Sequence, residues 1–125
     1  MTIQEAMDLA NQMKPNMMIP GTQIRFLSEL EGKIHEEIVM KHVHTEEEET
    51  KPQYDTGSDP GTVLLVPAPY DMLYVYWLMS KIDLMNMEMD KYNNDRALFE
   101  NAYDEMSDWW TRTKMPLQAA REFML

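Results

Sequence analysis

Apolar residues recur every three or four positions near the start of the chain, between Ile3 and Met13. This spacing is typical of one face of an α-helix. Thr2 precedes the segment and Glu5 follows three residues later, which is the spacing of an N-terminal capping box. Because the Lys14-Pro15 pair then disfavours continuation, the pattern predicts a first short helix that ends near residue 14.

A second helical pattern follows the Pro20-Gly21 pair and predicts a helix over residues 22 to about 43. The apolar positions of this segment fall on one helical face and are Ile24, Leu27, Leu30, Ile34 and Ile38. Gly32 lies inside the predicted helix, where glycine costs about 1 kcal/mol relative to alanine. We therefore interpret Gly32 as a point where another helix approaches closely.

The helical pattern stops at Thr45, and residues 45–61 are rich in acidic residues, proline and glycine. Such a segment is too charged and too rich in helix breakers to pack, which predicts a long, mobile, acidic loop. The next residues, 62–66, favour β-structure and predict one short strand. A single strand must pair with something, either the neighbourhood of Tyr54 or another subunit.

Residues 70–79 are apolar at nearly every position, which predicts a helix buried on all sides. A further apolar series continues to Trp110. Between them, Asn86 and the polar residues 88–95 favour a turn, so we predict a helical hairpin over residues 70–114. One continuous helix of about 45 residues is the alternative, because the apolar series passes the turn without a change of phase.

Pro116 ends the last predicted helix, and the residues after it are too few to fold alone. We therefore predict one helical domain, residues 1–114, with the acidic loop inserted, followed by a docking tail, residues 115–125. The tail residues expected to dock are Met115, Pro116, Leu117, Phe123, Met124 and Leu125. The predicted fold class is mainly α: a small helical bundle with a long C-terminal helical hairpin, one long acidic loop, a short β-strand and an extended tail.

Composition limits the possible functions. The 125 residues fit one domain and include no cysteine, which excludes disulfides and thiolate chemistry. The net charge of -11 repels phosphate, so the surface is not suited to gripping nucleic acid. No apolar run is long enough to span a membrane and the N-terminus lacks signal-peptide features, which predicts synthesis in the cytoplasm. The 14 methionines fill core gaps and also suit surfaces that adapt to several neighbours.

No pattern of catalytic or metal-binding residues is complete. His35 and Glu36 resemble the start of a zinc-protease helix, but the position of the required second histidine is Val39. His42 and His44 lack a fixed third ligand, so we interpret them as part of a solvated loop. The four glycines are scattered, which argues against a phosphate-binding loop. We therefore predict no enzyme, no cofactor and no metal.

Two groups of residues remain as candidates for binding. The first is the acidic run Glu46, Glu47, Glu48 and Glu49, which is a solvated loop by default, or else a metal trap, a mimic of DNA charge or a lining along which DNA slides. The second is the aromatic set Tyr74, Trp77, Trp109 and Trp110, which we assign to core or subunit interface because interleaved basic residues are missing. Trp109 and Trp110 point about 100° apart on a helix, so at least one is expected to face a partner.

Several stretches of the sequence resemble a known family. They are residues 27–34 (LSELEGKI), 64–78 (LLVPAPYDMLYVYWL), 81–83 (KID), 91–94 (KYNN), 98–103 (LFENAY) and 110–116 (WTRTKMP). On these residues the chain resembles the head-tail connector proteins found in phage and prophage structural gene clusters of Gram-positive bacteria. Relatives often carry Asn-Gly at the position of Asn86-Met87, which supports a turn there.

The resemblance implies an all-helical adaptor subunit in a homo-oligomeric ring, usually of twelve copies, beneath the portal protein of a long-tailed phage. Genome DNA would pass through the ring, and a stopper or tail-completion protein would bind below it. In this interpretation residues 115–125 dock on the portal, and Glu46, Glu47, Glu48 and Glu49 face the DNA channel. The protein would be made in the bacterial host cytoplasm and end in the virion neck.

A function of a different class is a small acidic inhibitor that imitates DNA and blocks a host DNA-binding protein. Acidic residues on the last predicted helix favour this alternative and are Asp90, Asp95, Glu100, Asp104 and Asp108. The densest charge, however, lies in a loop rather than across a folded face, which favours the ring subunit. A metal-dependent enzyme is the third alternative, and the metal content of the purified protein tests it.

Overall fold

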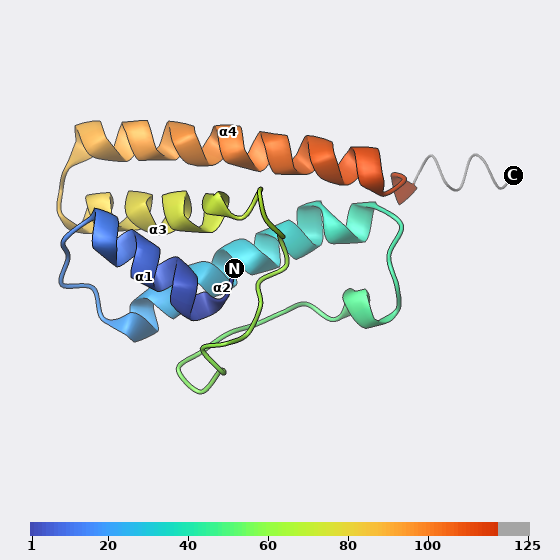
Figure 1. The fold of residues 1–125 in the computed structure, drawn as a ribbon, viewed down its shortest axis with the longest axis horizontal. Coiled ribbons are helices and arrows are strands. Elements are labelled where there is room, and N and C mark those ends of the chain that lie inside the picture. Colours follow the sequence, from blue (N-terminus) through green and yellow to red (C-terminus); the bar gives the residue numbers. More distant parts are fainter. Residues whose placement is uncertain (118–125) are drawn as a thin grey trace, which may run out of the picture.

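The computed structural model describes residues 1–117 of the chain, which form one small helical domain. Its helices are α1 (Ile3–Met13), α2 (Pro20–Glu37), α3 (Met72–Met85) and α4 (Met89–Thr113), with two short 3-10 helices, η1 (Val39–Lys41) and η2 (Glu47–Glu49). Helix α4 lies along α3, and α1 and α2 pack on α3 as well (Figure 1). The predicted mainly α fold is confirmed: residues 1–117 contain four α-helices and no β-strand.

The first helix begins as the sequence predicts. The backbone N–H of Glu5 donates to Thr2 Oγ1 at 3.1 Å, and the N–H of Thr2 donates to Glu5 Oε1 at 3.3 Å, which completes the capping box. Helix α2 ends at Glu37, earlier than predicted. The apolar series continues into the turn of η1, because Ile38 and Val39 stay buried although the α-helix has ended.

The predicted hairpin over residues 70–114 is confirmed, and the single continuous helix is wrong. Helices α3 and α4 are joined by Asn86, Met87 and Glu88 only. The N–H of Glu88 donates to the carbonyl of Asp83 at 2.9 Å, which closes the turn. Met87 has a φ of 58°, a left-handed conformation that reverses the chain direction.

The short β-strand predicted at residues 62–66 is wrong. Val63 makes only an isolated antiparallel bridge with Thr2, so within the domain this segment pairs with the N-terminal residues rather than with the neighbourhood of Tyr54. The next backbone donors are taken by side chains, since Leu65 N–H donates to Glu31 at 3.0 Å and Val66 N–H to the Tyr74 hydroxyl at 3.0 Å. A β-ladder cannot continue here, because these backbone N–H groups already donate to side chains and are not free to bond another strand.

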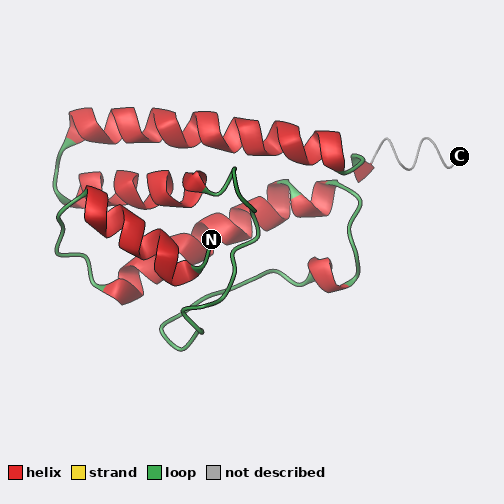
Figure 2. Ribbon diagram, viewed as in Figure 1, coloured by secondary structure: helices red, strands yellow, loops and turns green. Residues whose placement is uncertain are grey.

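The long connection between α2 and α3 runs beside the helices (Figure 2) and is attached to them at defined points. The N–H of Tyr54 donates to Ser28 Oγ at 2.9 Å, and His35 Nε2 lies 2.7 Å from the carbonyl oxygen of Glu48. The expectation that residues 45–61 do not pack is therefore wrong at Tyr54. Among the described helices, none is both long and apolar enough to cross a membrane.

Candidate functional site

Large apolar side chains are exposed mainly at one end of the domain. Of the eleven exposed large hydrophobic residues in the described part of the chain, seven lie at the α1–α2 connection and the α3–α4 turn: Met13, Met17, Ile19, Leu84, Met85, Met87 and Met89. We call this surface the methionine-rich end. Both connections lie at the same end of the bundle (Figure 1).

Local structure holds these side chains out of the core. Asn86 Nδ2 donates to the carbonyl of Pro15 at 3.2 Å, which ties the α3–α4 turn to the α1–α2 connection. Met17 and Met87 are 87% and 85% exposed, so water contacts nearly all of their surface. Exposed methionine is typical of surfaces that bind apolar partners, because the side chain is flexible and polarizable. This end is therefore suited to protein–protein contact.

An apolar groove of about 410 Å³ opens beside the methionine-rich end, between α2 and α3. It is lined by Met18, Thr22, Phe26, Lys81, Leu84 and Met85. Lys81 is the only charged residue of the lining, and its Nζ lies 4.4 Å from the centre of the Trp77 ring and 5.3 Å from that of Phe26. Cation–π contacts thus hold the ammonium at the groove, where it can meet an acidic ligand.

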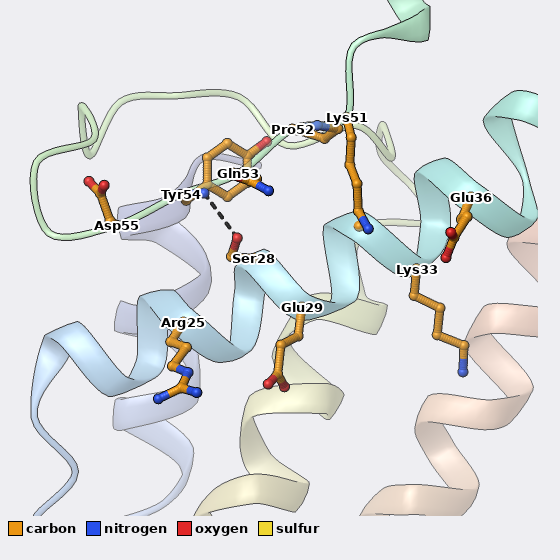
Figure 3. A pocket seen from close by; sticks show the side chains of 11 residues that line it. Arg25, Ser28, Glu29, Lys33, Glu36, Lys51, Pro52, Gln53, Tyr54 and Asp55 are labelled. Atoms are coloured by element: carbon orange, nitrogen blue, oxygen red, sulfur yellow. Dashed lines mark hydrogen bonds between the residues drawn. The ribbon is translucent and has the colours of Figure 1, made fainter.

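A second, polar groove of about 580 Å³ lies between α2 and residues 51–55. Figure 3 shows Lys51 reaching from the loop toward α2 and the hydrogen bond from Tyr54 to Ser28. The lining includes three cations and three carboxylates, Arg25, Lys33, Lys51, Glu29, Glu36 and Asp55. Since the charges balance, this groove does not favour a ligand of either sign.

Gly32 lines this polar groove, and its close neighbour is not another helix. A Cβ added at Gly32 would lie 2.8 Å from Cε of Lys51, so the close neighbour is a side chain of the loop. The interpretation of Gly32 as a helix–helix contact is therefore wrong.

Glu31 forms a buried hydrogen-bond network that the sequence did not reveal. Its carboxylate is 0% exposed and accepts from Tyr74 OH at 2.6 Å, Tyr54 OH at 2.8 Å and Leu65 N–H at 3.0 Å. Burial raises the pKa of Glu31, and the three donors oppose this shift. Burial and the neighbouring carboxylate raise the pKa values of Tyr54 and Tyr74, so both hydroxyls stay protonated and donate. The network joins α2, α3 and the loop inside the domain.

A second buried cluster joins α1, α3 and α4. Lys14 Nζ lies 2.8 Å from Asp83 Oδ1 and 2.8 Å from Asp95 Oδ2, and the three side chains are 16%, 0% and 9% exposed. One ammonium thus faces two carboxylates. Burial, together with the Asp95 carboxyl, raises the pKa of Asp83 to about 6 despite Lys14. Burial lowers the pKa of Lys14, but the two carboxylates outweigh it and the net shift is upward.

The aromatic residues assigned to core or interface lie mainly in the core. Tyr74, Trp77 and Trp110 are 0%, 8% and 6% exposed, so they belong to the domain interior. Trp109 is partly buried and stacks on Tyr70, with ring centres 5.1 Å apart. Both adjacent tryptophans therefore pack inside their own domain, and whether Trp109 also meets a partner stays a prediction.

The acidic run lies on the surface as predicted. Glu46, Glu47 and Glu49 are exposed, and Glu48 is half-buried. The Glu48 side chain accepts from the N–H of Thr45 at 3.2 Å, which favours the ionised carboxylate and lowers its pKa. Orientation toward a DNA channel stays a prediction.

The start of the predicted docking tail belongs to the domain. Val43 N–H donates to the carbonyl of Met115 at 2.9 Å, and Pro116 forms an isolated bridge with His42. The expectation that the tail leaves the body at residue 115 is therefore wrong, because these backbone contacts hold it. Leu117 is the last described residue, and Phe123, Met124 and Leu125 lie outside the described part.

The histidines do not form a metal site. His42 is buried, with Nδ1 2.7 Å from the carbonyl oxygen of Ile38 and Nε2 3.1 Å from Thr111 Oγ1, so its interpretation as a solvated loop residue is wrong. His44 Nε2 lies 3.4 Å from the carboxylate of Glu49. Residues 1–117 hold no group of three or more histidine or acidic side chains placed to bind a metal ion.

The arrangement supports binding more directly than it supports catalysis. Both buried ionisable clusters, around Glu31 and around Asp83, connect helices inside the domain, whereas the apolar groove and the methionine-rich end face solvent. Comparison with known proteins finds no matching family model, curated protein or solved structure. The groove and the methionine-rich end are the candidate functional site.

Proposed function

We propose that this protein is a structural subunit of the neck of a long-tailed phage, an adaptor that forms a ring between the portal and the tail. The methionine-rich end is the observation that carries the proposal. A small domain that keeps seven large apolar side chains in water at one end has a surface suited to other subunits. The resemblance of residues 64–78 to head-tail connectors adds support.

The proposed partners are further copies of the chain in a ring, the portal protein on one side and a stopper or tail-completion protein on the other. The charge of the chain suits a ring that DNA traverses. Its net charge of -11 repels phosphate, and three exposed glutamates at positions 46, 47 and 49 place negative charge on one loop. In a channel, this loop keeps DNA from adhering to the wall.

Electron microscopy of the purified protein, alone and mixed with the portal of the same phage, tests the proposal. We expect rings, or collars attached to the portal. A protein that stays a discrete monomer and binds no virion component would contradict it.

The channel role has its own test. Reversing Glu46, Glu47 and Glu49 to lysine leaves the bonds of Glu48 intact and should slow DNA packaging or ejection, because the loop then attracts phosphate. Asp8→Lys, at an exposed position of α1, is the control and should have no effect. Normal packaging in the triple variant argues against a lumenal loop.

The acidic DNA mimic is the second candidate, favoured by the exposed carboxylates of α4. Glu100, Asp104 and Asp108 are exposed at intervals of one helical turn, about 6 Å apart along the axis. A DNA strand carries one charge per about 3.4 Å, so this row is only about half as dense. Asp95 is buried and adds nothing to it. Competition between the protein and duplex DNA for a host nuclease or repressor discriminates the two functions.

A further inference from the structure

The apolar groove between α2 and α3 has the form of a site for a short apolar segment. It holds about 410 Å³ and four of its six lining residues are Met18, Phe26, Leu84 and Met85. An ammonium, that of Lys81, stands at this lining on the faces of Trp77 and Phe26. The matching ligand therefore carries several adjacent apolar side chains and a carboxylate beside them.

The chain itself contains such a segment after the described residues. Residues 122–125 read Glu-Phe-Met-Leu, which is one carboxylate followed by three large apolar side chains. The groove beside the end of α4, at residues 113–115, is less apolar. That groove is lined by Val43, His44, Thr45, Glu48, Thr113, Lys114 and Met115, of which only two are apolar.

Distance excludes binding of residues 123–125 in the apolar groove of their own subunit. Leu84 and Met85 are at the end of α3, beside the start of α4, whereas residue 117 follows the other end of α4. Helix α4 has 25 residues and is therefore about 37 Å long. The six Cα–Cα steps from residue 117 to residue 123 span at most about 22 Å when the chain is fully extended. The segment can reach only the groove of another copy.

We propose that the apolar groove binds the C-terminal segment of a second copy of this chain, with residues 123–125 in the groove and Glu122 facing Lys81. The contact is head-to-tail, since the groove lies near the start of α4 and the segment follows residue 117, which comes after the end of α4. Repetition of such a contact gives a ring where the rotation closes. The proposal rests on the proposed function, because both require that copies of this chain assemble with each other. It assigns residues 123–125 to the neighbouring subunit instead of the portal.

Sedimentation of the full-length protein over a range of concentrations tests the contact. We expect wild type to self-associate, and Met85→Asp in the groove or Phe123→Asp in the segment to weaken association at least tenfold. Met85 is 47% exposed, so the fold should survive, which the circular dichroism melt checks. Leu98→Asp is the matched control, because Leu98 is 45% exposed on α4 and belongs neither to the groove lining nor to the methionine-rich end.

Mixing the two variants provides the decisive measurement. The Met85→Asp subunit keeps its segment and the Phe123→Asp subunit keeps its groove, so an equimolar mixture has one intact contact per pair. It should form heterodimers and nothing larger. The pair Lys81→Glu with Glu122→Lys should restore part of the association that each single change removes.

Three results would overturn the proposal. They are a wild type that stays monomeric, a mixture of the two variants that stays monomeric, and a Phe123→Asp variant that loses portal binding while self-association is unchanged. A fourth result, self-association that neither Met85→Asp nor Phe123→Asp affects, would contradict this contact alone and would still be consistent with the ring function. Head-to-tail oligomers that do not bind the portal would instead support the contact and contradict the proposed function.

Discussion

At the scale of single residues, two buried acidic side chains determine how the domain is held together. Glu31 and Asp83 are both 0% exposed, and burial of a carboxylate is favourable only where donors or cations compensate its lost hydration. Glu31 has three donors from two other parts of the chain, whereas Asp83 shares a single ammonium with Asp95. The two residues should therefore respond differently to removal of charge.

The Glu31→Gln variant should be destabilised by about 2–3 kcal/mol, because an amide offers one acceptor oxygen to three donors and leaves at least one of them buried without a partner. Denaturant unfolding at pH 7 measures the change in the free energy of unfolding. Glu29→Gln, on an exposed position of the same helix, is the control and should change it little. Equal stability of the two variants would show that the network around Glu31 contributes nothing.

The Asp83→Asn variant should be more stable than wild type at pH 8 and similar to it at pH 4. The pKa of Asp83 is raised from 3.8 to about 6, so the folded state binds the proton more tightly than the unfolded state. This contribution to stability is fully present below pH 3.8 and is lost as the pH rises through about 6. Asparagine cannot ionise, so the variant keeps the folding stability that wild type loses at high pH, which is worth about 1–3 kcal/mol.

Thermal melts of wild type and Asp83→Asn from pH 4 to pH 8 measure this difference. Asp90→Asn on the exposed side of α4 is the matched control and should follow the wild-type profile. If the profiles of wild type and Asp83→Asn run parallel, the proton is not bound at this cluster.

At the scale of elements, the α3–α4 turn carries a local conflict between residue and conformation. Met87 adopts a φ of 58°, which is unfavourable for a side chain with a Cβ and neutral for glycine. The side chain of Met87 is 85% exposed and adds no core packing that would offset the cost. A methionine retained here is consistent with a role in binding, since this end of the domain is the methionine-rich end.

The Met87→Gly variant should therefore be more stable than wild type by about 1 kcal/mol, because glycine removes the left-handed strain. The midpoint of thermal unfolding measures it. Leu98→Gly, in the middle of α4 and also exposed, is the control and should lose about 1 kcal/mol through helix propensity. A loss of stability in Met87→Gly would mean that the turn contributes packing of its own.

At the scale of the whole molecule, the core of the described domain is built almost entirely before the end of α4. It combines α1, α2, α3 and α4, and the described chain after α4 contributes backbone contacts at Met115 and Pro116. Groove, methionine-rich end and acidic loop all face outward from this core. Assembly and folding should therefore be separable.

Deletion of residues 118–125 should leave the domain folded, because the described core lies within residues 1–117. Deletion of residues 115–125 should lower the melting temperature, since it removes the partner of the Val43 N–H and the bridge to His42. Circular dichroism melts of the two truncated proteins make the comparison. Identical melting temperatures would show that residues 115–117 contribute nothing to the fold.

Much of the fold follows from local patterns. Helix α1 is predicted by the capping box at Thr2, the start of α2 by the helix-breaking residues Pro15 and Pro20, and the hairpin by the polar residues near Asn86. These predictions succeed because helix periodicity and caps depend on residues within one or two turns. The predicted strand failed at Val63 because its ladder donors are taken by side chains far away in the sequence.

Of the candidate site, the sequence alone determined the ingredients: an acidic, methionine-rich, helical chain with an apolar C-terminal segment. Only the tertiary structure decided which methionines stay in water, which cation stands beside the groove and which carboxylates are buried. Met17 and Met7 are the same residue type, yet one is 87% exposed and the other 5%. Exposure depends on which segments pack together in the folded chain. The contacts between Lys14 and Asp83 and between Glu31 and Tyr74 join residues that are too far apart in the sequence for a local pattern to predict.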